Sequence, residues 1–356
     1  MTAEQASAHT ADTETAETSE AVAGQAEAAP VLSVDRMAVS YRTRRGPRGQ
    51  RLIRAVDDVS FDIGTGEILA LVGESGCGKT SIAKAITRLE EPAGGRVLFR
   101  GQDVAHVQGR ALRALRKDIQ MVFQDPFESL DPRLNAGDTV AEPLIVHGLP
   151  RPREKVLAAL EQVGLHPGAT MAGRYPHQMS GGQRQRLVIA AAMVLEPSLV
   201  IADEPVSMLD VSLRAGILRL MLDLRDSRGV SFLFVTHDLS LAWVVADRIA
   251  VVYLGRIVEI GAATEVIKNP RHPYTQALVS VIPVPETVPA GAARRERVLL
   301  TGEAPSAARI PSGCRFHPRC PLYRTLGEPE QCRTADPAPL PVTRTHQAAC
   351  HFTKEP

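Results

Sequence analysis

Nine consecutive residues have the types and the spacing that bind phosphate. In chain order they are Gly73, Glu74, Ser75, Gly76, Cys77, Gly78, Lys79, Thr80 and Ser81. They match the pattern Gly-x-x-x-x-Gly-Lys-[Ser/Thr], in which the glycines let consecutive backbone N–H groups curl around the β- and γ-phosphates. Lys79 is placed to reach those phosphates, and the Thr80 hydroxyl is placed to ligate Mg²⁺. The apolar run at 68–72 predicts a strand before the loop, and the spacing of Ile82 and Ile86 predicts a helix after it.

Two acidic residues follow a second apolar run, which predicts a strand over residues 199–202. Asp203 could hold Mg²⁺ there, directly or through water, and Glu204 could act as general base toward the attacking water. Taken alone, two acids after a strand can be a solvated strand end, and a glycine-rich turn can be purely structural. Together the two motifs indicate a nucleoside triphosphatase.

A second anion-binding element is predicted at the start of another helix. It is formed by Ser180, Gly181, Gly182 and Gln183. A serine and two glycines at a helix N-terminus offer free N–H groups to an anion. The apolar face of this helix runs through Leu187, Ala190, Ala191 and Val194. Because one nucleotide site already has a phosphate-binding loop, the extra element indicates that a second subunit completes the site.

These motifs and their order resemble the ATP-binding cassette (ABC) ATPases, whose signature is Leu-Ser-Gly-Gly-Gln. Met179 stands where that family usually has the first leucine, which is a mild apolar exchange. The resemblance covers residues 31–270. It implies an α/β P-loop nucleotide-binding domain with a β-subdomain and a helical subdomain, which uses ATP and Mg²⁺.

The resemblance also assigns roles to other residues. Gln124 is placed like the glutamine that contacts Mg²⁺ and the attacking water, and His237 like the histidine that contacts the γ-phosphate. With Glu204 they form the candidate catalytic set, while Thr80, Gln124 and Asp203 are the candidate Mg²⁺ ligands. Asp210 ends a Ser-Met-Leu-Asp segment that resembles the loop crossing the dimer interface, where the usual second residue is alanine. Tyr41 is placed like the aromatic residue that stacks on adenine, with an ordinary strand-end tyrosine as the alternative.

Three longer stretches, at residues 123–133, 175–186 and 269–278, resemble the ATPase subunits of oligopeptide and dipeptide importers. The tail at 313–321 resembles the C-terminal extension of that family. Residues 126–133 favour the second of the two ATPase subunit types that such importers use. Residues 206–215 depart from the commoner form and resemble relatives that carry oligosaccharides. Uptake of an oligosaccharide or of nickel by the same machinery is therefore the alternative.

The resemblance implies partners as well as chemistry. They are a paralogous ATPase subunit, two integral membrane permease subunits and, indirectly, an external substrate-binding protein, with no nucleic acid. ATP would lie between the phosphate loop of this chain and the signature segment of the partner. Closure of the two subunits would move the permease through the helical insert, at the cytoplasmic face of the cell membrane, and hydrolysis through Glu204 would reopen them.

Other classes of protein are disfavoured. A soluble cassette ATPase acting on nucleic acid or ribosomes would need long coiled coils or a second cassette, and the formal net charge of +1 gives no case for nucleic-acid binding. A P-loop kinase is disfavoured by the Ser-Gly-Gly-Gln segment and His237. A GTPase would also need an Asn-Lys-x-Asp motif to read guanine.

The rest of the sequence predicts the elements that position these residues. Strands are expected over residues 31–40, 59–63, 67–72, 97–99, 119–123, 199–202, 232–235, 249–253 and 256–260. A helix is expected over 211–225. A helical insert is expected over about 126–186, with breaks at Pro143, Pro150, Pro152 and Pro176. The alternation of strands and helices predicts an α/β domain over residues 31–280.

The two ends of the chain differ from this domain. Residues 1–30 carry six acids and no lysine or arginine, which predicts a disordered acidic tail and neither a signal nor a transit peptide. The longest apolar run, residues 187–195, is too short to span a membrane. A role at a membrane therefore requires docking to another chain. Residues 281–356 are rich in proline and arginine and are expected to form a separate small unit.

Four of the five cysteines lie in that last unit, at Cys314, Cys320, Cys332 and Cys350. A nucleotide-binding protein without an export signal implies a reducing compartment, so disulfides are not expected. Four thiolates can hold a zinc ion or a [4Fe–4S] cluster, although the spacing is not that of a common zinc motif. Some relatives with this tail are thought to hold an iron–sulfur cluster, so the resemblance favours the cluster over zinc. Four unligated thiols are the alternative.

Overall fold

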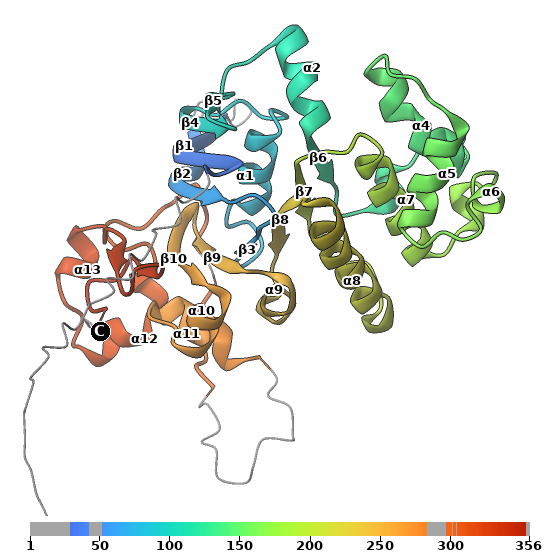
Figure 1. Ribbon diagram of the computed structural model, residues 1–356. Helices are drawn as coiled ribbons and strands as arrows, with labels where there is room; N and C mark the ends of the chain where they lie inside the picture. Colours follow the sequence, from blue (N-terminus) through green and yellow to red (C-terminus); the bar gives the residue numbers. More distant parts are fainter. Residues whose placement is uncertain (1–28, 43–51, 283–296, 301, 304, 354–356) are drawn as a thin grey trace, which may run out of the picture.

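The computed structural model describes residues 29–42, 52–282, 297–300, 302–303 and 305–353. The expected acidic tail over residues 1–30 lies almost entirely outside this part of the chain. Two sheets and the helices around them make up the fold, which is the expected α/β class (Figure 1).

The larger sheet has eight strands in the order β11-β12-β10-β9-β3-β8-β7-β6. Its centre is parallel: β3 (Ile68–Val72) pairs with β8 (Ser231–Thr236) and β9 (Arg248–Tyr253), and β7 (Leu199–Asp203) pairs with β8 and β6 (Ile119–Val122). Strands β3, β7 and β8 are buried along their whole length. A parallel strand covered on both faces needs apolar side chains on both, which explains why these segments appear in the sequence as continuous apolar runs.

The smaller sheet is antiparallel, in the order β2-β1-β4-β5. Its strands are β1 (Leu32–Arg42), β2 (Leu52–Ile63), β4 (Gly94–Phe99) and the two-residue β5 (Gln102–Asp103). Buried residues of β1, β2 and β4 share a second hydrophobic core with α1 (Lys79–Ile86) and one face of the larger sheet. This sheet therefore covers the helix that follows the phosphate loop.

Further helices surround the larger sheet. They are α2 (Gly109–Asp118), α8 (Val211–Arg228), α9 (Leu239–Val245), α10 (Ala263–Lys268) and α11 (Pro273–Ser280). The helix expected over 211–225 is α8, which ends at Gly229 in a left-handed conformation. Between Gly229 and α9, β8 returns the chain to the centre of the sheet.

The helical insert lies at one end of the molecule (Figure 1). It consists of α3 (Pro126–Ser129), α4 (Ala136–Val146), α5 (Arg153–Gln162), α6 (Gly168–Met171), the 3-10 turn η1 (Pro176–Gln178) and α7 (Gly181–Met193). The expected break at Pro143 is wrong, because Pro143 lies inside α4. Buried Val140, Ala141 and Leu144 hold that helix on the core across the proline, and this packing outweighs its lost hydrogen bond.

Residues 305–353 lie at the opposite end of the molecule (Figure 1). We call residues 305–353 the C-terminal extension. It contains the 3-10 turn η2 (His317–Arg319), α12 (Pro321–Thr325), α13 (Gln331–Thr334), β11 (Leu340–Pro341) and β12 (Gln347–Ala348).

The extension, expected to be a separate small unit, shares both sheet and core with the rest of the chain. Strand β12 pairs with β10 (Arg256–Ala262), and Phe316, Cys320 and Tyr323 belong to the same hydrophobic core as β3. The expected boundary near residue 280 adjoins residues 283–296, which lie outside the described part of the chain.

No helix in the described part of the chain is both long enough and apolar enough to cross a membrane.

Candidate functional site

Four strands of the larger sheet end at one edge, and each is followed by candidate site residues. The phosphate loop follows β3, Gln124 comes shortly after β6, and His237 follows β8. Asp203 is the last residue of β7, and Glu204 comes next. Because parallel strands in one sheet present their carboxyl ends at the same edge, residues as far apart in the sequence as Thr80 and Asp203, 123 positions, are brought together there. Thr80, Gln124 and Asp203 line one cleft of ≈ 750 Å³.

The phosphate loop is held tightly from behind. An added Cβ at Gly73 would lie 2.2 Å from the Val252 carbonyl oxygen, and one at Gly78 would lie 2.4 Å from the Ala55 carbonyl oxygen. Gly78 also has φ +107°, which side chains rarely adopt. Both positions therefore require glycine for space, and Gly78 requires it for conformation too.

Lys79 is buried and faces back into this loop. Its Nζ donates to the carbonyl oxygens of Gly73 at 2.7 Å and Glu74 at 3.0 Å. Both acceptors are neutral carbonyls. The ammonium would form stronger hydrogen bonds with charged phosphate oxygens, so it would exchange these carbonyl bonds for phosphate bonds. The remaining residues of the motif are Ser75, Gly76, Cys77 and Ser81. Among them, Cys77 is buried, and Gly76 has positive φ with open space around its Cα.

Thr80 and Asp203 form a pair suited to Mg²⁺. The Thr80 hydroxyl donates to Asp203 Oδ1 at 3.4 Å. Burial raises the pKa of the Asp203 carboxyl. The hydrogen bond from Thr80 lowers that pKa and the neighbouring charge of Glu204 raises it, and the net direction is upward. A hydroxyl and a carboxylate are the hard oxygen ligands that Mg²⁺ prefers, so the residues present fit that ion.

Glu204 is the centre of a second polar group. Its Oε2 lies 3.1 Å from His237 Nδ1, and it accepts a hydrogen bond from Gln124 Nε2 at 3.4 Å. The Glu204 backbone has φ +47°, and its N–H donates to the Val235 carbonyl oxygen at 2.9 Å. The chain thus turns sharply after β7, so Glu204 points to the strand ends where Gln124 and His237 lie.

The Ser-Gly-Gly-Gln segment begins α7, as expected. Ser180 Oγ accepts from the Gln183 N–H, and Gln183 Oε1 accepts from the Ser180 N–H. This reciprocal capping box leaves the N–H groups of Gly181 and Gly182 in the first turn of the helix, where no intrahelical acceptor exists. Among the described residues, no hydrogen bond or ion pair joins this segment to the phosphate loop of the same chain.

Asp210 and Tyr41 lie at other places around the site. Asp210 caps α8, because its Oδ1 accepts from the Leu213 N–H at 3.0 Å. The Tyr41 hydroxyl donates to Ser81 Oγ at 3.1 Å, so its ring lies beside the start of α1. Stacking of Tyr41 on adenine stays a prediction.

The four late cysteines come near one another in the extension. Burial raises the pKa of Cys314 to about 12 and that of Cys320 to about 11, and the neighbouring cysteines add to both effects. The Cys314 N–H donates to the Cys332 carbonyl oxygen at 2.9 Å. In the described part of the chain, however, no three His, Cys, Asp or Glu side chains lie close enough to hold a metal ion. The structure therefore does not support the expected metal group.

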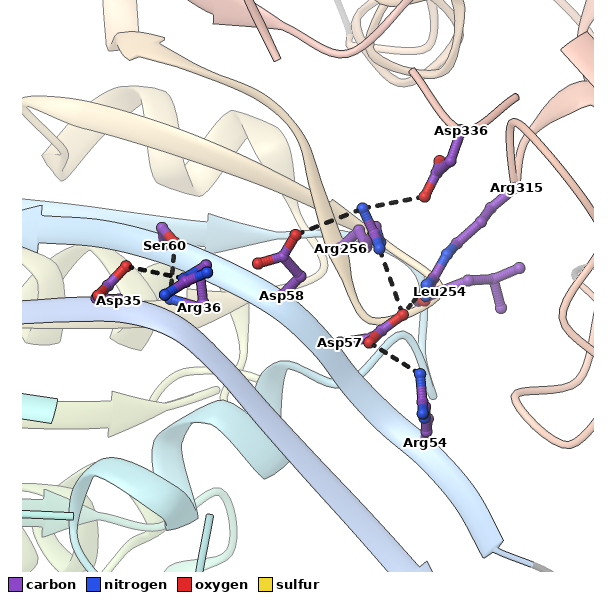
Figure 2. Close-up of polar contacts among 10 residues, drawn as sticks. All are labelled: Asp35, Arg36, Arg54, Asp57, Asp58, Ser60, Leu254, Arg256, Arg315 and Asp336. Atoms are coloured by element: carbon purple, nitrogen blue, oxygen red, sulfur yellow. Dashed lines mark hydrogen bonds and ion pairs between the residues drawn. The ribbon is translucent and has the colours of Figure 1, made fainter. Parts of the chain in front are cut away.

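Two arginines of the extension contact the phosphate loop and the smaller sheet, and neither was predicted from the sequence. Arg319 forms an ion pair with Glu74 of the phosphate loop, with Nη1 2.9 Å from Oε2. Arg315 pairs with Asp57 on β2 and donates to the Leu254 carbonyl oxygen, and Arg256 connects Asp57 to Asp336 of the extension (Figure 2). The only local signal is that each arginine adjoins a cysteine in the sequence.

Two family models match the chain. The model described as ABC transporter matches residues 56–207, and the one described as Oligopeptide/dipeptide transporter, C-terminal region, matches residues 258–325. The first covers the phosphate loop and the β7 strand end. The second covers the first part of the extension, including Arg315 and Arg319.

Curated relatives span nearly the same length. The chain is 46% identical over 304 residues to the oligopeptide transport ATP-binding protein AppF of Bacillus subtilis, which covers 84% of this chain and 90% of that protein. It is 43% identical over 329 residues to the di/tripeptide transport ATP-binding protein DppF of Pseudomonas aeruginosa, covering 91% and 98%.

Solved structures match the ATPase part. The ATP-binding cassette MJ0796, in a dimeric post-hydrolysis state bound to ADP and Pi, gives a TM-score of 0.57 at 28% identity, covering 65% of this chain and 98% of that one. The cbiO1 protein of Clostridium perfringens, part of an ABC transporter complex, gives 0.60 at 26% identity, covering 67% and 91%.

Proposed function

This chain belongs to the ATP-binding cassette family as the ATP-binding protein of an oligopeptide or dipeptide importer, and from that premise we propose how its residues use ATP. The observation that carries the proposal is the meeting of four strand ends at one edge of the larger sheet. Each supplies one part of a phosphate-hydrolysing site, and the parts occur in the order that the family uses.

The phosphate loop binds the triphosphate. Its backbone N–H groups and the N-terminus of α1 surround the β- and γ-phosphates, and Lys79 exchanges its two carbonyl acceptors for phosphate oxygens. Thr80, Gln124 and Asp203 would hold Mg²⁺, which neutralises charge on the phosphates. Tyr41, beside Ser81, is placed to stack on the adenine.

Glu204 is the general base. Its carboxylate accepts a proton from water as the water oxygen bonds to the γ-phosphorus and the bond to the bridging oxygen breaks, which leaves ADP and phosphate. Gln124 and His237, both within hydrogen-bonding distance of Glu204 Oε2, orient the water and contact the γ-phosphate.

A second ATPase subunit completes the site. The first-turn N–H groups of α7 have no partner in this chain's own phosphate loop. In a head-to-tail dimer, α7 of each subunit would face the γ-phosphate bound by the phosphate loop of the other subunit. Ser180, Gly181, Gly182 and Gln183 serve the partner's ATP in the same way. The partner is a paralogous subunit, and Asp210, at the start of α8, lies in the loop that crosses between the two.

Transport follows from closure of this dimer. The importer's membrane permease subunits are the mechanical partners, contacted through the helical insert, and an external substrate-binding protein delivers the peptide. The chain is peripheral and works at the cytoplasmic face of the membrane. ATP binding closes the two subunits, and hydrolysis through Glu204 lets them reopen.

Replacing Glu204 by glutamine tests this assignment. Glu204→Gln keeps the shape and the contacts of the side chain but removes the base. The assembled transporter should lose at least about 100-fold in ATP hydrolysis while still binding ATP, since general-base catalysis contributes on that order. Cells carrying the variant should also lose uptake of labelled short peptides.

Glu154→Gln, on the exposed face of α5, is the matched control and should leave hydrolysis and uptake unchanged. Unchanged turnover in Glu204→Gln would exclude Glu204 as the base. If labelled oligosaccharide or nickel uptake is lost while peptide uptake survives, the mechanism stands but the substrate class is wrong.

We further propose that the four late cysteines hold a [4Fe–4S] cluster when iron is supplied. The proposal is supported by the place of all four cysteines in the extension, where the Cys314 N–H donates to the Cys332 carbonyl oxygen at 2.9 Å. A cluster is larger than one ion, so its four sulfurs lie farther apart than those around zinc. Protein purified anaerobically should contain iron, Cys320→Ser should lose it and Cys77→Ser should keep it. Parental protein without stoichiometric iron contradicts this proposal.

A further inference from the structure

Glu74 places a negative charge inside the loop that is proposed to bind ATP. The loop otherwise has the features that attract an anion: glycines, free N–H groups, a helix N-terminus and Lys79. A carboxylate close to a triphosphate repels it, and the repulsion is strong where the surroundings are partly buried. Something in the folded chain must therefore offset Glu74.

Arg319 is the group that does so. Its guanidinium meets the Glu74 carboxylate in three contacts: Nη1 lies 2.9 Å from Oε2 and 3.2 Å from Oε1, and Nη2 lies 3.2 Å from Oε1. The Arg319 side chain is only 9% exposed and that of Glu74 is 30% exposed. A bidentate ion pair of this kind fixes the orientation of the carboxylate as well as offsetting its charge.

The pair is held from both sides. The Glu74 N–H donates to the Tyr274 hydroxyl at 3.0 Å, which fixes the backbone of the loop at this residue. On the other side, the Arg319 N–H donates to the Phe316 carbonyl oxygen at 3.0 Å. The Phe316 ring packs on Tyr253 and Tyr274, with centroids 5.1 Å and 5.4 Å away. The extension thus presents Arg319 to Glu74 from a packed base.

Losing Arg319 would also affect Lys79. The Lys79 Nζ lies 3.0 Å from the backbone carbonyl oxygen of Glu74, and Lys79 is the only basic residue of the loop. A carboxylate released from Arg319 would compete with ATP for that ammonium. Removal of Arg319 therefore has two effects in one direction, added repulsion and a less available lysine.

We propose that Arg319 is a positioning residue for ATP binding, which neutralises Glu74 and turns its carboxylate away from the phosphates. The C-terminal extension thereby contributes to the nucleotide site of this chain through Glu74. The proposal rests on the proposed function of the phosphate loop. It adds a requirement to that function, namely that the extension be docked for ATP to bind well.

The test is a rescue experiment on the full chain, with Mg²⁺-ATP titrated calorimetrically. Arg319→Met should weaken ATP binding about tenfold, which corresponds to about 1.4 kcal/mol. Glu74→Gln on the same background removes the charge that Arg319 offsets, so the double variant should bind within about twofold of the parent. In the assembled transporter, the KM for ATP of Arg319→Met should rise by the same factor with kcat nearly unchanged.

Two other arginines provide controls. Arg324→Met changes an exposed side chain of α12 and should bind ATP like the parent. Arg315→Met removes a different contact of the extension, the ion pair with Asp57. If this variant binds ATP more weakly, adding Glu74→Gln should not restore the affinity. The proposal is overturned if Arg319→Met binds ATP like the parent. It is also overturned if the double variant binds ATP as weakly as Arg319→Met, which would indicate a general structural role of Arg319.

If Arg319→Met does not fold, the double variant alone decides. It carries no unpaired charge, so it should fold and bind ATP within about twofold of the parent, and weak binding would overturn the proposal. Failure of the underlying function looks different: the parental chain itself would then show no saturable ATP binding, and Lys79→Ala would change nothing.

Discussion

At the scale of single residues, His272 is enclosed on all sides and stays uncharged in the folded chain. Burial lowers its pKa to about 4, which the negative charge of Glu259 opposes only in part. Its Nδ1 accepts a hydrogen bond from the Tyr274 N–H and so caps α11. His272 thus connects the pH of the solution to the helix that holds Tyr274 against the phosphate loop.

This enclosure predicts a loss of stability in acid. A histidine in the unfolded chain has a pKa of about 6.5, so between pH 6.5 and 4 the unfolded state binds a proton that the folded state does not. Stability therefore falls as pH falls through this window. His272→Asn keeps a capping acceptor without titrating, and from pH 7 to 4.5 it should lose about 2 kcal/mol less than the parent in urea unfolding.

The control for this prediction is His106→Asn, because the His106 side chain is 68% exposed. That variant should follow the parental pH profile. Identical profiles for His272→Asn and the parent would contradict the assignment of this pH dependence to His272.

At the scale of elements, the turn between β3 and α1 depends on backbone space. Gly78 lies against the Ala55 carbonyl oxygen on β2, whereas Gly148, after α4, has φ +65° and nothing within 4 Å of an added Cβ. Both glycines have a left-handed backbone, but only one is also crowded. Comparing substitutions at Gly78 and Gly148 therefore separates the cost of backbone strain from the cost of steric overlap.

Gly148→Ala should cost about 1 kcal/mol of stability, which is the strain of a left-handed alanine. Gly78→Ala should cost about 3 kcal/mol or more and abolish ATP binding, because β2 and the loop must also move apart. Urea unfolding and ATP titration of the two variants measure this difference. Equal costs would mean that β2 yields easily and that the contact is not rigid.

Elements were predictable where one local pattern determined them. Strands β3, β7 and β8 are continuous apolar runs, and α8 has both an apolar stripe and a glycine stop. Helix α2 was not predicted, because it buries only Leu115 and its other residues are mostly charged. Pro143 was misread because its helix is held by tertiary packing. The two-residue strands β11 and β12 exist only because β10 is present to pair with them.

The candidate site divides in the same way. The phosphate loop, Asp203–Glu204 and the Ser-Gly-Gly-Gln segment are contiguous motifs, so each could be identified locally. Gln124 was assigned only through the resemblance to the ABC ATPases, and its contact with Glu204 is explained by the parallel strands that end at one edge. The pairing of Glu74 with Arg319 joins residues 245 positions apart, and no periodicity or motif connects them.

At the scale of the whole molecule, the extension and the ATPase domain share one core. Phe316 is almost fully buried between Tyr253 of β9 and Tyr274 of α11, so the rings join three segments of the chain. The ion pairs of Arg315 with Asp57 and of Arg256 with Asp336 also join the two parts (Figure 2). The two parts should therefore unfold together.

Phe316→Ala tests that cooperativity. It should lower the free energy of unfolding by about 3 to 5 kcal/mol, as expected for a large buried ring, while the parent unfolds in a single transition. Leu326→Ala, at a side chain 46% exposed, should change stability by less than about 0.5 kcal/mol. Two separate transitions in the parent, with Phe316→Ala shifting only one, would show that the extension is an independent unit.

The distance along the chain between Glu74 and Arg319 also has a consequence in time. A ribosome adds about 5–20 residues per second, so the 245 residues between them take roughly 12 to 50 s to make. The strands that hold the phosphate loop are complete only at Tyr253, so the loop can be folded without its arginine during the last 66 residues of that interval, about 3 to 13 s. A growing chain would thus bind ATP poorly until the extension emerges and docks. Competence for nucleotide arrives late in synthesis, which delays ATP binding until nearly the whole subunit is present.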